Sequence, residues 1–196
     1  EAGFAKERIP APIGIGTVGY SALGATSSAS PYADMFPATQ NLHGHPEIKT
    51  VVLSRGDPYE IVFVRLDTVG VFQQLRRDVV LRVLEQSGRD IDSSLVMGGT
   101  HTHSGPGRVV DVGGLFDLIA DSFHPAFYDQ FVNAIVDTIL QAYDDLETAR
   151  IDVLSSNSDT AHNDRRCEDG GPDYENGEIP LIAIERGGDI DLLVAG

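Results

Sequence analysis

Residues 94–107 read Ser94-Leu95-Val96-Met97-Gly98-Gly99-Thr100-His101-Thr102-His103-Ser104-Gly105-Pro106-Gly107. The apolar start predicts a buried strand at Leu95–Met97, and the glycine- and proline-rich end predicts a turn that cannot continue this strand. Residues i and i+2 of an extended chain point the same way, so His101 and His103 can face one site. Neutral imidazole is the commonest protein ligand of zinc and similar metals, whereas a hydrogen-bonded surface pair is the competing interpretation. The position favours a site, because α/β proteins bind ligands at the carboxyl ends of strands.

Composition limits the classes of protein to consider. The 196 residues, of which 41% are hydrophobic, suffice for one domain with a core. The net charge of −16, from 30 acidic and 14 basic residues, argues against nucleic acid as a partner, because phosphate binding needs clustered Lys and Arg. No apolar run is long enough for a membrane helix, and the single cysteine, Cys167, excludes an internal disulfide. With 7% aromatic residues and no tryptophan, we expect no aromatic-rich surface for membrane docking.

Strand and helix patterns alternate along most of the chain. We expect strands at Ile13–Thr17, Ile48–Leu53, Glu60–Leu66, Leu95–Met97, Ile151–Leu154, Ile179–Ile184 and Ile190–Val194, and helices at Phe72–Gln86 and Ala126–Tyr143. Gly88 is a stop signal for the first helix, and Gly187-Gly188 predicts a hairpin between the last two strands. The pattern predicts an α/β fold, a mixed β-sheet with flanking helices. Because the sequence stops directly after an apolar strand, we expect an incomplete portion of a larger catalytic domain.

Four further features are weaker candidates for function. Gly14-Ile15-Gly16 lacks the third glycine of a dinucleotide site, and His43-Gly44-His45 lies in a polar loop that no strand precedes. Asp67 ends a predicted strand, and it either points toward the histidines or caps the segment that follows. His124-Pro125 is typical of a helix start, which makes His124 a poor candidate for a metal ligand.

The nine residues Gly99–Gly107 resemble the signature of the neutral, non-lysosomal ceramidases. A looser similarity extends over nearly all of the chain, through the glycine-rich opening around Gly14–Tyr20, the Leu53–Arg55 segment, the strand ending in Asp67 and the hairpin at Ile179–Val194. The resemblance implies that residues 1–196 are the amino-terminal part of a ceramidase-like zinc amidase domain. It implies a zinc-dependent hydrolase of sphingolipid metabolism that cleaves the amide bond of an N-acyl lipid such as ceramide.

The resemblance also assigns roles to individual residues. The first signature histidine of the family ligates zinc, so His101 is the implied ligand. The second hydrogen-bonds the attacking water or the developing oxyanion, so His103 is the implied catalytic helper. The family uses an arginine from a later Asn-Arg segment, and here His162-Asn163-Asp164-Arg165-Arg166 corresponds to it with disturbed spacing. We favour Arg165 for this role, with Arg166 as the alternative and a solvated pair of arginines as the competing interpretation.

The implied site is incomplete within this sequence. The remaining zinc ligands of the family are a histidine, a glutamate and a tyrosine, which we expect from the remainder of the same protein or from a second chain. The family implies a secreted or periplasmic protein in peripheral contact with membrane. The departure around Arg165 leaves open a non-catalytic ceramidase-like α/β subunit or binding module, and a metal-dependent esterase is a further alternative.

Overall fold

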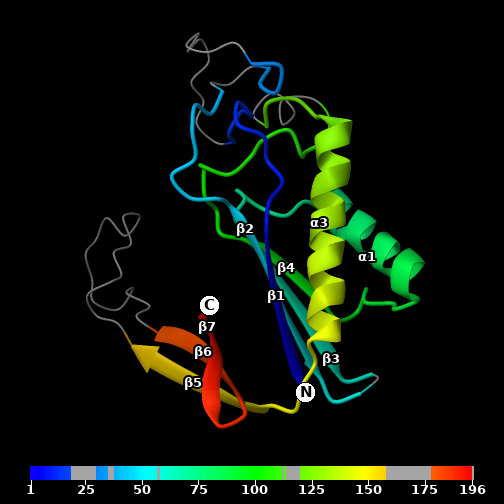
Figure 1. The fold of residues 1–196 in the computed structure, drawn as a ribbon, viewed down its shortest axis with the longest axis vertical. Coiled ribbons are helices and arrows are strands. Elements are labelled where there is room, and N and C mark those ends of the chain that lie inside the picture. The colour runs from blue at the N-terminus through cyan, green and yellow to red at the C-terminus, as the bar shows by residue number, and fades with distance from the viewer. Residues whose placement is uncertain are drawn as a thin grey trace, which may run out of the picture. The chain divides into compact units, whose positions relative to one another are not determined.

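A computed structural model describes residues 1–18, 30–34, 38–56, 58–111, 113, 120–157 and 178–195. The chain divides into two compact units (Figure 1), one of residues 3–146 and one of residues 1–2 with 147–196. In the larger unit the strands β1 (Ala2–Arg8), β2 (Glu47–Ser54), β3 (Glu60–Leu66) and β4 (Leu95–Gly99) form a sheet in that order. The helices are α1 (Gln73–Ser87) and α3 (Pro125–Asp144).

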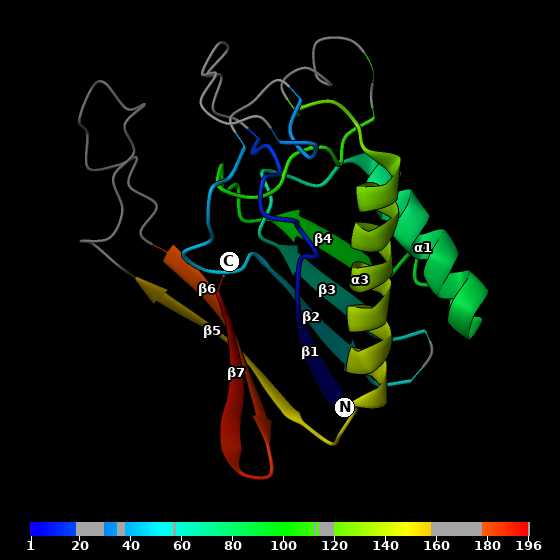
Figure 2. The ribbon, with the colours of Figure 1, turned by 45° about the horizontal axis from the view of Figure 1, so that its top comes forward.

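The sheet of the larger unit is mixed, as the sequence predicts. Strand β2 pairs antiparallel with β3, while β3 pairs parallel with β4 through the crossover that contains α1. Both helices cover one face of this sheet, and Figure 2 shows the four strands side by side behind α3. Alternate strand residues therefore enter the core on that face, with Ile48, Val52, Val62, Val64, Leu66 and Leu95 all buried.

The two helices follow their predicted apolar stripes closely. Leu75, Val79 and Val83 of α1 are buried, and Gly88 ends this helix in the left-handed conformation with φ of 72°. Buried residues of α3 include Phe127, Phe131, Ile135 and Ile139, as its spacing predicts. At the ends of the helix predicted at Phe72–Gln86, Phe72 precedes α1 and packs partly buried against the core, whereas Gln86 is exposed.

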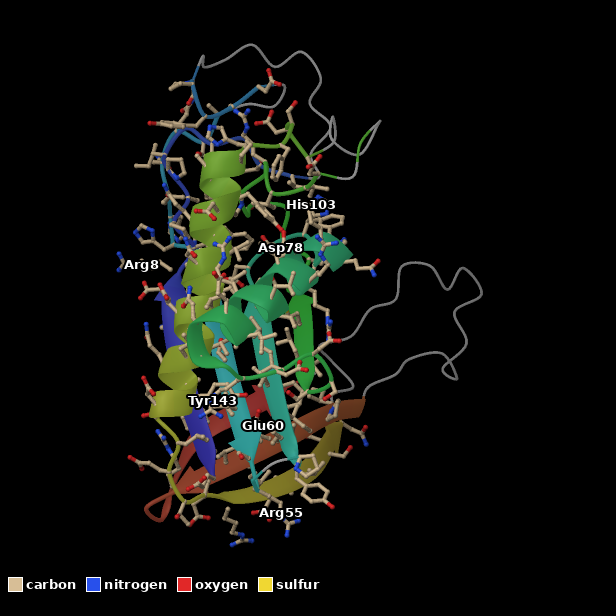
Figure 3. All side chains as sticks on the ribbon, turned by 90° about the vertical axis from the view of Figure 1, so that its right-hand side faces the viewer. Arg8, Arg55, Glu60, Asp78, His103 and Tyr143 are labelled. Carbon is tan, nitrogen blue, oxygen red and sulfur yellow. The ribbon has the colours of Figure 1, made fainter. Side chains whose placement is uncertain are left out.

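Two tyrosine hydroxyls attach α3 to its neighbours. The Tyr128 hydroxyl donates to Asp78 Oδ2 of α1 at 2.7 Å, and the Tyr143 hydroxyl donates to Glu60 of β3. Burial, followed by the adjacent carboxylate, raises the pKa of each phenol above its ordinary value. Figure 3 shows Tyr143 and Glu60 near one end of the sheet, with His103 toward the other. The Tyr143–Glu60 bond therefore holds the end of the sheet away from the histidines, whereas the Tyr128–Asp78 bond joins the two helices.

The first strand differs from the sequence prediction. We expected an irregular opening with a short strand at Ile13–Thr17, whereas the strand is β1, and Gly16 and Thr17 form only isolated bridges. The sequence of β1 contains no β-branched residue, so its strand propensity is low. It forms because Gly3 lets the strand approach α3: a Cβ there would lie 1.9 Å from the Ala142 carbonyl oxygen.

The smaller unit holds a separate antiparallel sheet. Strands β5 (Arg150–Asn157), β6 (Glu178–Arg186) and β7 (Asp189–Ala195) pair in chain order. Gly187 and Gly188 join β6 to β7 with φ of 65° and 101°, which confirms the predicted hairpin. The sequence predicts one mixed sheet, whereas the strands form two sheets. The reason is that β5 pairs with β6 and not with a strand of the larger unit. Within the described ranges, neither helix combines the length and hydropathy that a bilayer crossing requires.

Replacing Gly3 with alanine tests the close contact between β1 and α3. We expect Gly3→Ala to lower the free energy of unfolding by about 1–3 kcal/mol, because backbone must move to admit the methyl group. Gly98→Ala is the matched control, since a Cβ at this strand glycine meets nothing within 4 Å. Urea denaturation measures both variants, and equal losses of stability would contradict the role assigned to Gly3.

Candidate metal and catalytic loop

The two signature histidines follow the carboxyl end of the parallel strand pair. Because β3 and β4 are parallel, both strands end at the same edge of the sheet, where Leu66 aligns with Gly99. The Thr100 amide extends this pairing by donating to the Leu66 carbonyl oxygen at 2.9 Å. The chain then leaves the sheet, and His101 and His103 lie in the loop. The structure thus places the pair where the sequence predicts a site.

The glycines of the signature allow this loop to lie directly against neighbouring backbone. A Cβ at Gly99 would lie 2.8 Å from the Gly70 Cα, and one at Gly105 would lie 2.5 Å from the Asp67 carbonyl oxygen. A Cβ at Gly107 would lie 2.9 Å from the Ala120 carbonyl oxygen. Each distance is too short for a side chain, so the spacing of the glycines is a packing requirement. The histidine loop is fixed at both ends by these contacts.

The two imidazoles are neighbours, although the reason differs from the sequence prediction. His101 has a φ of 59°, in the left-handed region, so the segment is not the extended strand from which we argued that i and i+2 share a face. The turn itself brings the rings together, with centroids 5.3 Å apart and planes inclined by 63°. The Ser104 amide donates to Thr102 Oγ1 within the turn. His101 is exposed and His103 is partly buried, so the two rings have unequal access to solvent.

A non-glycine residue in the left-handed region carries backbone strain. Such strain persists only where the surrounding contacts impose it, and at His101 the flanking close contacts of Gly99 and Gly105 do so. The loop therefore holds its imidazoles in a fixed arrangement, which suits a ligand or a catalytic group.

Asp67 belongs to the sheet rather than to the histidine pair. Its carboxylate accepts a hydrogen bond from the Glu47 amide at 3.0 Å, and its own amide donates to the Glu47 carbonyl oxygen at 3.0 Å. Arg65 lies 3.9 Å from the same carboxylate. These bonds prolong the pairing of β2 with β3 by one residue. The cap interpretation placed this bond in the segment after Asp67, whereas the donor is the first residue of β2.

The remaining histidine candidates have other positions. His124 is the residue before α3, and its Nδ1 accepts a hydrogen bond from the Phe127 amide, which confirms the predicted helix start. His43 and His45 are exposed in a loop, as expected. His162, Arg165 and Arg166 lie outside the residues that the structure describes.

The histidine loop suits one part of a zinc site. An exposed imidazole at His101 is a suitable ligand, and the chemistry of a histidine pair matches zinc. Catalytic zinc usually has three protein ligands, and the described part of the chain contains no group of three or more His, Cys, Asp or Glu side chains that could hold a metal. A zinc site at this loop would therefore need ligands from beyond the described residues.

One cation near the loop was not singled out from the sequence. Arg108 follows the signature directly and has a φ of 68°, and its Nε atom is buried without a hydrogen-bond partner among the residues that the structure describes. Its position beside the signature was the only sequence signal, and charge alone does not distinguish it from other arginines. Its left-handed backbone and its burial arise from tertiary contacts.

The fold and loop together define a class: an α/β domain with a histidine pair in a glycine-fixed loop beyond two parallel strands. The sequence model described as "Neutral/alkaline non-lysosomal ceramidase, N-terminal" matches residues 14–168. The chain therefore belongs to the neutral/alkaline non-lysosomal ceramidase family.

Similar proteins agree with this family. Neutral ceramidase A of Dictyostelium discoideum is 26% identical over 141 residues, which cover 71% of this chain and 20% of that protein. Neutral ceramidase 1 of Arabidopsis thaliana is also 26% identical, over 71% of this chain and 18% of that protein. The chain thus spans about a fifth of the length of these relatives.

Two solved structures share the fold. A neutral ceramidase from Pseudomonas aeruginosa matches with a TM-score of 0.82 at 20% identity, over 99% of this chain and 31% of that one. A ceramidase described as complexed with C2 matches with a TM-score of 0.81 at 20% identity, over 99% of this chain and 30% of that one. The predicted mixed sheet with flanking helices is thereby confirmed, and it corresponds to a fraction of these larger chains.

Replacing Gly105 with alanine tests whether backbone contact fixes the histidine loop. We expect Gly105→Ala to lower the free energy of unfolding by about 1–3 kcal/mol, because the methyl group would overlap the Asp67 carbonyl. Histidine ring resonances in NMR spectra should shift as the loop moves. Gly98→Ala again serves as control, and unchanged stability and spectra in Gly105→Ala would show that the loop does not need this contact.

Proposed function

We propose that residues 1–196 form the amino-terminal part of a ceramidase-like zinc amidase domain, and that the whole protein cleaves the amide bond of an N-acyl lipid such as ceramide. The observation that carries this proposal is the fixed histidine pair beyond the parallel strands of a chain that belongs to this family. The match to neutral ceramidases of two organisms supports the substrate class.

In this proposal the two histidines have different roles. His101 presents its exposed imidazole as one ligand of zinc, which when bound polarises a carbonyl oxygen and lowers the pKa of water. His103, whose ring lies 5.3 Å from that of His101, donates a hydrogen bond to the oxyanion that develops on the amide carbonyl, or accepts the proton of the attacking water. The fixed loop positions His103 before substrate arrives, so little reorganisation is needed.

A guanidinium completes the proposed set of catalytic groups. Arg165 supplies a second donor to the developing oxyanion, and Arg166 is the alternative for the same role. Preorganised donors of this kind stabilise charge more effectively in a water-poor site than in bulk water. Both arginines lie outside the described residues, so family resemblance is the support for this assignment.

The proposed partners follow from the same assignment. The substrate is an N-acyl lipid or another amide, and the remainder of the same protein or a second chain supplies the further zinc ligands. A secreted or periplasmic location with peripheral membrane contact would suit a lipid substrate. The net charge of −16 makes nucleic acid an unsuitable partner.

Two other functions are alternatives to the zinc amidase. The departure from the family pattern at Asn163–Arg166 favours a non-catalytic ceramidase-like α/β subunit or binding module. A metal-dependent esterase could use the same loop, because ester and amide hydrolysis pass through similar oxyanions. Turnover of a matched N-acyl amide and ester pair distinguishes these alternatives from the amidase.

Substitution of each signature histidine tests the division of roles. In the whole protein we expect His101→Ala to lose most of the bound zinc, whereas His103→Ala should retain zinc and lose about 10²–10⁴-fold in kcat. Elemental analysis and amide hydrolysis measure the two effects, with His43→Ala as an exposed control. Equal zinc content in the wild type and His101→Ala would refute the ligand assignment.

The arginine assignment has its own test. We expect Arg165→Ala to lower kcat about 10²–10³-fold through loss of an oxyanion donor, while Arg166→Ala changes it little. Zinc content should stay constant in both variants, because neither arginine is a ligand. The reverse pattern of kcat would assign the role to Arg166, and full activity in both variants would remove arginine from the proposal.

A further inference from the structure

A pocket separate from the histidine pair opens between the segment before β2 and the start of α3. Its volume is about 350 Å³, within the roughly 300–1,000 Å³ typical of small-molecule sites. The lining is mostly apolar, and it includes Pro10, Pro12, Ile15, Ala126 and Phe127. Neither His101 nor His103 lines it. All of these residues belong to the larger unit.

Arg108 is the cation of this pocket. Among the described residues its Nε atom is buried without a hydrogen-bond partner, and none of the ion pairs found there includes it. The Nε atom is closed to water, but the Arg108 side chain as a whole is partly exposed and lines the pocket. Its guanidinium therefore offers a positive charge to a ligand in a mostly apolar lining, where a charge-assisted hydrogen bond is stronger than in bulk water.

The backbone fixes Arg108 in this position. Its amide donates to the Ala120 carbonyl oxygen at 2.6 Å, and its carbonyl oxygen accepts from the His124 amide at 3.0 Å. The residue is held in the left-handed region with φ of 68°, a strained conformation for a residue with a side chain. The start of the side chain is therefore preorganised, which lowers the entropy lost when a ligand binds.

His124 adds a second donor to the lining. Its Nδ1 accepts the Phe127 amide hydrogen, so the proton of the neutral ring is on Nε2. His124 also lies at the amino terminus of α3, where the helix dipole favours negative charge. Two donors beside apolar surface match a ligand with an anionic head and an apolar body.

We propose that this pocket binds a small amphipathic carboxylate, with the carboxylate on the Arg108 guanidinium and the hydrocarbon part against Ile15 and Phe127. A planar guanidinium pairs with a carboxylate through two parallel hydrogen bonds. A hydroxyl cannot form this charged pair, and a small inorganic anion has no hydrocarbon to bury in the pocket. The proposal does not depend on the amidase assignment, because binding here requires neither metal nor turnover.

Isothermal titration of the chain with sodium octanoate tests the pocket directly. We expect octanoate to bind at least about tenfold more tightly than octanol and than inorganic phosphate, because only octanoate uses both the charge and the apolar lining. Arg108→Met should weaken octanoate binding at least about tenfold and leave octanol binding nearly unchanged. Arg77→Met is the control, since Arg77 is exposed on α1 and does not line the pocket.

A second variant tests whether octanoate occupies the pocket without changing Arg108, whose replacement could also alter the fold. Ala126 is exposed and lines the pocket, so Ala126→Trp should fill the space and abolish binding of both octanoate and octanol while circular dichroism stays unchanged. The proposal is overturned if octanoate does not bind the wild type, if octanol or phosphate binds equally well, or if folded Arg108→Met or Ala126→Trp binds octanoate like the wild type. If the whole protein binds octanoate but does not hydrolyse N-acyl amides, the proposed function is contradicted and the pocket proposal stands.

Discussion

The close contact between the histidine loop and the backbone of residues 67–70 is the constraint on which the candidate site depends. Parallel pairing of β3 and β4 brings the two segments to one edge of the sheet, and glycines at 99 and 105 let them touch. Any side chain at either glycine would separate the segments by moving backbone. Because the loop is fixed at both ends, His101 can hold a left-handed conformation that would be unfavourable in a free loop.

Helix α3 connects that edge of the sheet with the rest of the larger unit. Helix α3 packs along the sheet, its apolar side chains form much of the core, and its tyrosines reach Asp78 and Glu60. At the amino terminus of α3, His124 caps the first turn and its amide donates to the carbonyl oxygen of Arg108. One helix thus connects the core with the position of a cation beside the signature. This arrangement separates two chemical features: a histidine pair of which one ring is exposed, and an arginine in a mostly apolar pocket.

Family membership and partial length together shape the functional interpretation. The chain matches the family over most of its residues, yet it spans about 30% of the solved ceramidase chains. An exposed imidazole at His101 is consistent with a ligand set to which other segments contribute, and the proposed amidase chemistry requires those segments. The pocket at Arg108 is different, because all of its described lining residues belong to the larger unit of this chain.

The sequence by itself determined the elements with strong periodicity and their order. Both helices, the strands from Glu47 onward and the glycine hairpin were predictable, because apolar spacing and turn residues are local signals. So was the place of His101 and His103 at the end of a strand. Only the tertiary structure decided the rest. Strand β1 has weak propensity and forms through contact with α3, and the second sheet depends on pairing between distant segments. The histidine rings meet through a turn, and Arg108 enters a pocket, because backbone contacts far apart in sequence impose left-handed conformations there.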